Sequence, residues 1–150
     1  MKLILAVDPG KATGLAFFQV EAGQDPVLLS SKEVQQHEYA KPIRDILTSN
    51  NDTEIVCERF TINAQTVRNS QAPFSLEQIG ILKQCLLDVG RNAEDIYFQS
   101  PSDAKAMFDN SKLKKLGYWH KGGEGHALDA IRHGLLRCVK LGWKPVKLLE

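Results

Sequence analysis

The feature of this chain that most restricts its fold is a short apolar run that stops at an acidic residue. Residues 3–7 are all apolar, and Asp8, Pro9 and Gly10 follow them directly. A continuous apolar run of this length is typical of a strand buried on both faces of a sheet. Asp8 then stands at the carboxyl end of that strand, where open sheets collect ligands.

The rest of the pattern predicts an α/β fold. Turn residues separate five short apolar or alternating segments, and helical spacing appears after the third of them. The predicted strands are residues 3–7, 14–20, 27–34, 54–57 and 96–98. Short turns join the first three strands, which predicts an antiparallel meander, and helices alternate with the later strands, which predicts βαβ crossovers. The expected result is a mixed five-stranded sheet flanked by helices.

The predicted helices are placed by their periodicity and by their first residues. Residues 39–47 carry apolar side chains at helical spacing. Ser75 with Gln78 resembles a capping box that opens a helix running to residue 87. Ser102 starts a short helix, and residues 126–141 form the last one. The segment 61–72, between the fourth predicted strand and the helix that begins at Ser75, is polar and irregular.

The composition is that of an ordinary cytosolic globular protein. The 150 residues suffice for a single domain (1–150) with a sizeable core, 43% of them are hydrophobic, and the net charge is +1. Three cysteines, widely separated among apolar neighbours, indicate reduced core residues rather than disulfides or a zinc site. The first apolar run is too short for a signal peptide or a membrane span. We therefore expect a cytoplasmic protein with no membrane partner.

Three acidic residues and a histidine stand at the edges of apolar elements. Asp8 ends the first strand, Glu58 ends the fourth, and His126 lies three residues before Asp129 at the start of the last helix. Two simpler interpretations stay open, because Asp8 can merely cap its turn and Glu58 can pair with Arg59. Brought together, however, these groups would repel one another unless cations held them. The combination predicts a pair of divalent metal ions and phosphodiester chemistry.

The two histidines of the last helix have different expected roles. His126 follows a glycine-rich loop at residues 122–125. It is either a metal ligand or a carrier of protons for the attacking water or the leaving group. His133 lies on the same helical face and is expected to be a satisfied core residue or a surface group.

In order along the chain, these blocks resemble the RuvC family of Holliday junction resolvases, within the ribonuclease H-like fold. Residues 5–10, with Thr13 and Gly14, are similar to the family's first strand and its catalytic Asp, and Glu58 matches its second carboxylate. Residues 126–130 are similar to the final-helix motif, in which a His or an acid precedes another acid by three positions. Residues 101–105 resemble the segment after the fifth strand, where a Lys contacts DNA.

The resemblance implies a metal-dependent endodeoxyribonuclease that resolves four-way junctions and leaves 5′-phosphate and 3′-hydroxyl ends. Its catalytic and metal-binding residues would be Asp8, Glu58, His126 and Asp129, holding two Mg²⁺ ions with Mn²⁺ as a substitute. Two symmetric cuts need a two-fold assembly, so a homodimer is expected, with the helix over residues 75–87 either as interface or as core. The host would be a bacterial cell or a cell infected by a phage.

Basic and aromatic residues near the site are the expected contacts to branched DNA, because cations offset the repulsion between phosphates and carboxylates. A flat aromatic ring such as that of Trp119 would stack on an exposed base. Since the segment between Lys105 and His126 is shorter than the family's, its lysines cannot be matched one by one. Phe60 would take the family's junction-wedging role, with Phe74 or a plain core position as alternatives. The expected DNA-binding set is Phe60, Lys105, Lys112, Lys114, Lys115, Trp119 and Lys121.

Three other functions stay open. A flap, fork or ribonuclease H-type nuclease would use the same residues and metals, and only a panel of substrates separates it from a junction resolvase. An actin-like or sugar-kinase ATP-binding fragment has a similar turn after its first strand, but such ATPases need two domains and a second phosphate loop. A non-catalytic DNA-binding module would not need Asp8, Glu58 and Asp129 together.

Overall fold

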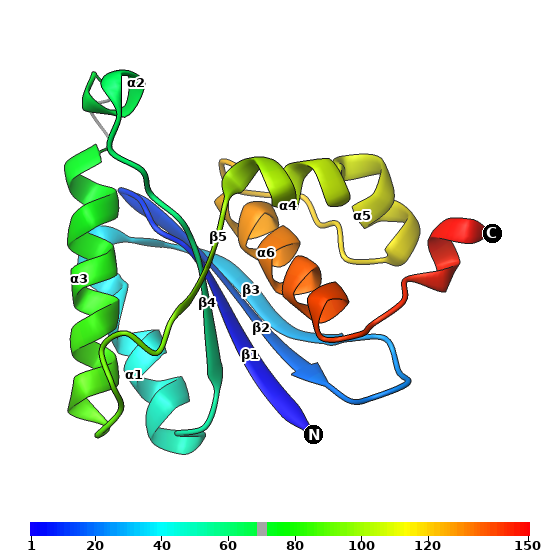
Figure 1. The fold of residues 1–150 in the computed structure, drawn as a ribbon, viewed down its shortest axis with the longest axis horizontal. Coiled ribbons are helices and arrows are strands. Elements are labelled where there is room, and N and C mark those ends of the chain that lie inside the picture. The colour runs from blue at the N-terminus through cyan, green and yellow to red at the C-terminus, as the bar shows by residue number, and fades with distance from the viewer. Residues whose placement is uncertain (69–71) are drawn as a thin grey trace.

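The computed structural model describes residues 1–68 and 72–150, and its centre is a five-stranded sheet (Figure 1). The strands are β1 (Lys2–Asp8), β2 (Ala12–Val20), β3 (Val27–Gln35), β4 (Glu54–Glu58) and β5 (Tyr97–Gln99). They lie in the order β3-β2-β1-β4-β5. The β1–β2 and β2–β3 pairs are antiparallel, whereas the β1–β4 and β4–β5 pairs are parallel. The predicted mixed sheet is therefore confirmed.

Helices cover both faces of the sheet, which explains why β1 is apolar without alternation. On one face lie α1 (Ala40–Ser49) and α3 (Ala72–Asp88); on the other lie α4 (Pro101–Met107), α5 (Asn110–Leu116) and α6 (His126–Lys140) (Figure 1). Within β1, Leu5 and Val7 belong to the core on the α1–α3 face, while Ile4 and Ala6 belong to the core on the α6 face. All four side chains are completely buried.

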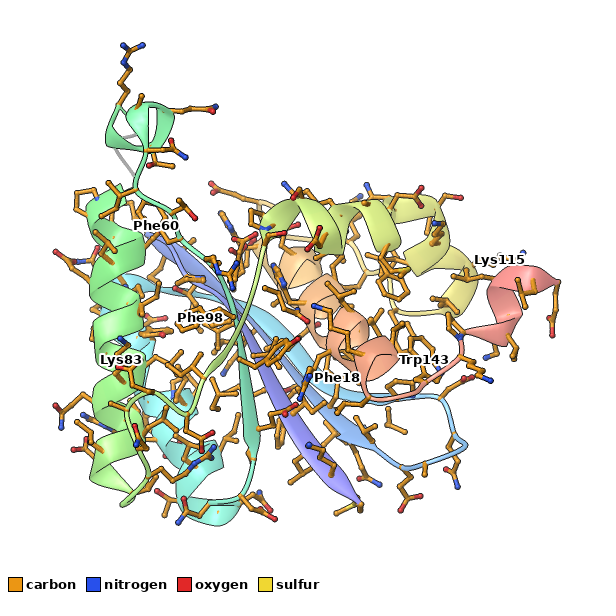
Figure 2. The ribbon with its side chains drawn as sticks, viewed as in Figure 1. Phe18, Phe60, Lys83, Phe98, Lys115 and Trp143 are labelled. Carbon is orange, nitrogen blue, oxygen red and sulfur yellow. The ribbon has the colours of Figure 1, made fainter. Side chains whose placement is uncertain are left out.

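Close packing holds α6 against the antiparallel half of the sheet. Phe18 of β2 contacts Tyr118 edge-on, with ring centroids 6.4 Å apart. A Cβ atom built on Gly134 of α6 would lie 2.2 Å from the Phe18 ring, so the helix can approach this closely only because it has glycine there. Figure 2 shows Phe18 and Trp143 on the α6 side of the sheet, whereas Lys83 belongs to α3 on the other side. This packing places the first turn of α6 over the carboxyl end of β1.

The structure corrects two predicted helix starts. α3 begins at Ala72 and not at Ser75, because Pro73 suits the first turn of a helix. The Ser75 hydroxyl donates instead to the carbonyl oxygen of Pro9 at 3.1 Å, so the predicted capping box is wrong. Likewise, α4 begins at Pro101, where the side chain of Ser100 accepts a hydrogen bond from the third residue of the helix.

Four short elements lie outside the predictions. Two of them, α5 and the single turn α2 (Ala64–Val67), are α-helical. The others are the 3₁₀ turns η1 (Gln36–Glu38) and η2 (Val146–Leu149). α2 falls in the segment 61–72 predicted to be irregular, of which residues 69–71 lie outside the described part. Across residues 1–68 and 72–150, no helix is both long enough and apolar enough to cross a membrane.

Candidate metal centre

Two of the predicted acidic residues end neighbouring parallel strands. Asp8 is the last residue of β1 and Glu58 the last residue of β4. The strands are in register, with Val7 opposite Cys57, so the two carboxylates follow side by side at the same edge of the sheet. Asp8 is only 5% exposed, and Glu58 is half-buried. This edge therefore concentrates negative charge in a place with little access to water.

The first turn of α6 brings the other two predicted residues to the same place. His126 is the first residue of the helix, and its Nδ1 lies 3.2 Å from Asp8 Oδ2. Asp129 lies one turn later, and ligand atoms of Asp8, His126 and Asp129 all fall within 4.8 Å of one another. Residues from opposite ends of the chain thus form one cluster.

A glycine and a distant carboxylate hold the start of α6 in position. Gly14 pairs with Asp8 across the β1–β2 hairpin, and a Cβ atom built on it would lie 1.9 Å from the backbone oxygen of His126. The Glu33 side chain on β3 accepts hydrogen bonds from the backbone N–H groups of Glu124 and His126, each at 2.8 Å. Gly14 therefore allows the start of α6 to lie directly against β2.

The pKa values of Asp8 and His126 reflect burial and the neighbouring polar groups. Burial raises the pKa of Asp8 well above its ordinary value, and the Glu58 carboxyl adds to the rise, although the hydrogen bond from His126 opposes it. The hydrogen bond to Asp8 in turn raises the pKa of the His126 imidazole to about 9. The negative charges of Glu58 and Asp129 contribute to the raised pKa of Asp8, and the same charges attract cations.

Two residues that bind the carboxylates of the cluster, His133 and Arg132, were not predicted from the sequence to do so. Burial raises the pKa of Glu58, but the hydrogen bonds with His133 and Asp8 and the nearby positive charge of Lys105 together outweigh burial, and the net pKa is about 2. The distance from His133 Nε2 to Glu58 Oε1 is 3.3 Å, whereas Arg59, the partner considered from the sequence, is exposed. Arg132 donates to Asp129 Oδ1 at 2.7 Å. The helical spacing from Asp129 to His133 was the one sequence signal that pointed to His133.

The expected DNA contacts are distributed unevenly around the cluster. Lys105 on α4 lies beside the cluster, since its charge helps to lower the pKa of Glu58 and it lines a hollow of about 410 Å³ together with Asp129. Lys114 lies 4.6 Å from the ring centre of Trp119, which is 36% exposed. Lys115 instead donates to the backbone of Glu150 at the end of the chain (Figure 2).

The remaining three members of that set differ in exposure. Lys112 is half-buried and donates to the carbonyl oxygen of Met107, while Lys121 is exposed on the loop before α6. Phe60 is half-buried on the segment that follows Glu58 (Figure 2). Its alternative, Phe74, is also half-buried and has Lys11 5.8 Å from its ring centre.

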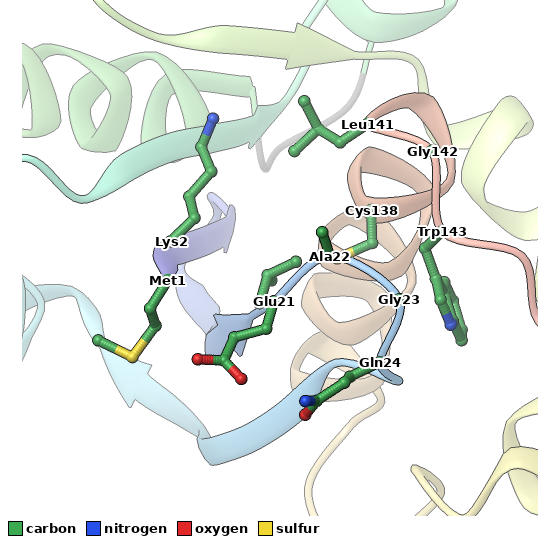
Figure 3. Close-up of a pocket in the computed structure, with 11 residues that line it drawn as sticks. Met1, Lys2, Glu21, Ala22, Gly23, Gln24, Cys138, Leu141, Gly142 and Trp143 are labelled. Carbon is green, nitrogen blue, oxygen red and sulfur yellow. The ribbon is translucent and has the colours of Figure 1, made fainter.

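A larger hollow lies away from the acidic cluster. It has a volume of about 610 Å³ and is lined by Met1, Lys2 and Trp143, among others (Figure 3). Lys2 begins β1, whereas Asp8 ends it, so this hollow is at the opposite end of the strand. The carboxylates and the hollow therefore do not form one site.

The donor set at the carboxyl edge fits divalent cations. Carboxylate oxygens from Asp8, Glu58 and Asp129 are the ligands that Mg²⁺ and Mn²⁺ prefer, and an imidazole nitrogen from His126 is compatible with Mn²⁺. The cluster is open enough to admit a ligand, because Glu58, His126 and Asp129 all keep partial exposure. These four residues are the ones that could hold the metal.

Comparison with known proteins places the fold. No protein-family model and no curated protein matches the chain. Among solved structures, it is similar to Thermus thermophilus RuvC in complex with a Holliday junction substrate, with a TM-score of 0.71, and to a second Thermus thermophilus RuvC structure, with 0.70. Each is 16% identical, and each match covers 93% of this chain and 96% of the RuvC chain.

A viral structure is similar as well. The Fowlpox virus resolvase in complex with Holliday junction DNA has a TM-score of 0.55 and 13% identity, over 94% of this chain and 99% of the resolvase. The matches span nearly all of both chains, so they include the sheet and the last helix that carry the acidic cluster. The protein therefore has the ribonuclease H-like fold of RuvC.

Proposed function

We propose that this protein is a divalent-metal-dependent endonuclease that resolves four-way DNA junctions. The observation that carries the proposal is that ligand atoms of Asp8, His126 and Asp129 converge at one edge of a RuvC-like sheet, with Glu58 at the end of the neighbouring strand. The similar structures from Thermus thermophilus and Fowlpox virus are both described with Holliday junction DNA. Fold and site thus support the same substrate class.

The four residues have distinct tasks in this proposal. The carboxylates of Asp8, Glu58 and Asp129 hold two Mg²⁺ or Mn²⁺ ions, which when bound activate water and offset negative charge at the scissile phosphate. Asp8 is nearly buried, so it keeps a fixed position at the centre of the set. His126 Nδ1 faces Asp8 Oδ2, which makes this imidazole a further ligand or the carrier of a proton to the leaving oxygen.

Lys105 is the proposed first contact to the DNA backbone. It is exposed on α4, and it lines the hollow beside Asp129 together with Arg132. A cation at this place reduces the repulsion between a phosphate and the carboxylates. Phe60, Lys112, Lys114, Trp119 and Lys121 are proposed as further contacts.

We also propose that two copies act together, because a four-way junction needs two symmetric cuts. Leu76 and Leu87 on α3 are 45% and 51% exposed, which supports this helix as part of the interface. Light scattering of the purified protein, alone and with a junction, measures the assembly. A monomer under both conditions would contradict this part of the proposal.

Cleavage by the wild type and by Asp8→Asn tests the function. The variant replaces one carboxylate oxygen by an amide nitrogen, so we expect cleavage to be lost and junction binding to be kept. End-labelled four-way junction, fork, flap, duplex and RNA–DNA hybrid are incubated with Mg²⁺, Mn²⁺ or EDTA. Asp52→Asn, in the exposed turn before β4, is the matched control and should cleave like the wild type.

The pattern of products decides between the related activities. Paired symmetric nicks in the junction, absent in EDTA, support a resolvase with 5′-phosphate and 3′-hydroxyl products. Preferred cutting of the fork, flap or hybrid would keep the metal chemistry and replace the substrate. Cleavage by Asp8→Asn at the wild-type rate would remove the proposed site.

A further inference from the structure

The carboxylate of Glu58 is contacted by a histidine that is almost completely buried. His133 is 1% exposed, and its Nε2 lies 3.3 Å from Glu58 Oε1. It lies on α6 one helical turn after Asp129, so the helix that carries one candidate ligand also contacts another. The imidazole therefore engages one of the two carboxylate oxygens of Glu58.

Gln99 determines which ring nitrogen of His133 carries the proton. This residue pairs with Glu58 in the β4–β5 register and is 2% exposed. Its Nε2 lies 2.9 Å from the backbone oxygen of His133 and 3.1 Å from His133 Nδ1. Because a carbonyl oxygen can only accept, the amide nitrogen of Gln99 faces it as the donor. The Nδ1 atom is then an acceptor, and the proton is on Nε2, facing Glu58.

This arrangement is made at the expense of another hydrogen bond. The amide oxygen of Gln99 is buried and has no hydrogen-bond partner within the described part of the chain. An unsatisfied buried acceptor is unfavourable and needs a reason. The reason offered by the geometry is that the amide nitrogen must point at both acceptors of His133.

We propose that His133, oriented by Gln99, is the positioning residue that holds Glu58 for metal binding. The proposal rests on the proposed function, since it assumes that Glu58 is a metal ligand. In metal sites, groups that hydrogen-bond a ligand commonly set its orientation and change the affinity for the metal. A histidine that only fills the core would have no effect on metal binding beyond its effect on folding.

The substitutions His133→Gln and His133→Asn distinguish positioning of Glu58 from core packing, because their amide groups reach different distances from the backbone. Gln can place a donor near the position of Nε2, whereas Asn places it near Nδ1 and does not reach Glu58. We measure Mn²⁺ affinity by isothermal titration calorimetry on metal-free protein, and the melting temperature in EDTA. We expect His133→Asn to weaken Mn²⁺ binding by about 10–100-fold. His133→Gln should restore most of that loss.

Arg137→Met is the matched control for lost packing between α6 and β4. Arg137 lies one turn beyond His133 and also bonds a side chain of this strand, Glu54, at 2.8 Å. The control should lower the melting temperature and leave Mn²⁺ affinity unchanged. Wild-type affinity in His133→Asn, or equal losses in His133→Asn and His133→Gln, would overturn the proposal.

Junction cleavage by the wild type, measured in the same buffers, separates this inference from the proposed function. If the wild type binds Mn²⁺ and cuts no DNA, the proposed function fails while the variant affinities still decide the role of His133. If the wild type binds no Mn²⁺, both proposals are overturned.

Discussion

At the scale of single residues, each candidate ligand has a partner that restricts its orientation. Glu58 contacts His133, Asp129 contacts Arg132, and the backbone of His126 is bound by Glu33. Arg132 is itself held, since it donates to the carbonyl oxygen of Phe108 at 2.7 Å and bonds the side chain of Asn110. A site built in this way is organised before metal or substrate arrives, which lowers the cost of binding them.

A residue-scale prediction concerns the pair formed by Glu54 and Arg137. Arg137 donates two hydrogen bonds to Glu54, at 3.0 and 2.8 Å. Burial raises the pKa of Glu54, but the hydrogen bonds and charges of Arg137 and Lys2 together outweigh burial, so the net pKa is lowered. A lowered folded-state pKa stabilises the fold above the unfolded pKa, about 4.3, and this contribution is lost as pH falls through the folded value.

Urea unfolding in EDTA at several pH values measures this contribution. We expect Glu54→Gln to lower the free energy of unfolding at pH 7 by about 1–3 kcal/mol, because it removes a charge-assisted pair. The difference from the wild type should shrink as the pH falls from about 4.3, the unfolded pKa of a Glu, to the lower pKa of folded Glu54. Glu38→Gln, at an exposed position, is the control. A difference that does not vary with pH would contradict the prediction.

At the scale of elements, the site depends on how closely α6 lies against β2. Neither Gly14 nor Gly134 has room for a side chain. Gly14 lies against the backbone of His126 at the site, and Gly134 lies against the ring of Phe18. These two glycines let a helix and a strand approach along much of the helix length. The position of His126 and Asp129 therefore follows from the contact between the two elements.

Gly14→Ala tests this contact at the end that carries the site. Since the added Cβ would lie 1.9 Å from the His126 backbone oxygen, α6 must shift. We expect the free energy of unfolding to fall by about 1–3 kcal/mol, with Mn²⁺ binding weakened more than stability alone explains. Gly80→Ala on α3 is the control, because its Cβ has open space. That control should gain about 0.4–1 kcal/mol.

The same measurements can contradict the prediction. Calorimetric titration with Mn²⁺ and urea unfolding are applied to both variants under identical conditions. If Gly14→Ala matches the wild type in both, the close approach of α6 is not needed for the site. Gly134→Ala, which meets the Phe18 ring instead, should lose stability with a smaller effect on Mn²⁺ affinity.

At the scale of the whole molecule, the two faces of the sheet differ in whether their lysines lie beside the acidic cluster. The α4 face carries Lys105 beside the acidic cluster, whereas Lys83 lies on α3, across the sheet, and pairs with Glu94 at 3.3 Å (Figure 2). Phosphate contacts release counterions, so binding weakens with salt in proportion to the number of contacts. A comparison of the two lysines therefore tests which face meets DNA.

Fluorescence anisotropy of a labelled junction in EDTA, at several salt concentrations, gives the slope of log affinity against log salt. We expect Lys105→Ala to make that slope less negative by about 1, the effect of one lost phosphate contact. Lys83→Ala should keep the wild-type slope. Equal effects from both variants, or binding that is independent of salt, would contradict a DNA surface on the α4 face.

Much of the fold and the cluster could be predicted from the sequence. The antiparallel meander, the mixed character of the sheet and the burial of β1 follow from local periodicity and turn residues, which are properties of neighbouring residues. The capping box at Ser75 was a wrong prediction because Pro73 starts the helix earlier and Ser75 bonds Pro9, 66 positions away. α5 was missed because it is seven residues long and lacks a proline in its first turn, a start signal that the equally short α4 has.

By itself, the sequence determined the five strands, the longer helices and the placement of acidic residues at their ends, because these are encoded by local patterns of apolar and polar residues. Only the tertiary structure decided what holds those residues. His133 meets Glu58 across 75 positions, and Glu33 meets His126 across 93. Such contacts depend on how α6 packs on the sheet, and no periodicity within either segment encodes that packing. The close contact between Gly14 and the start of α6 likewise depends on this packing.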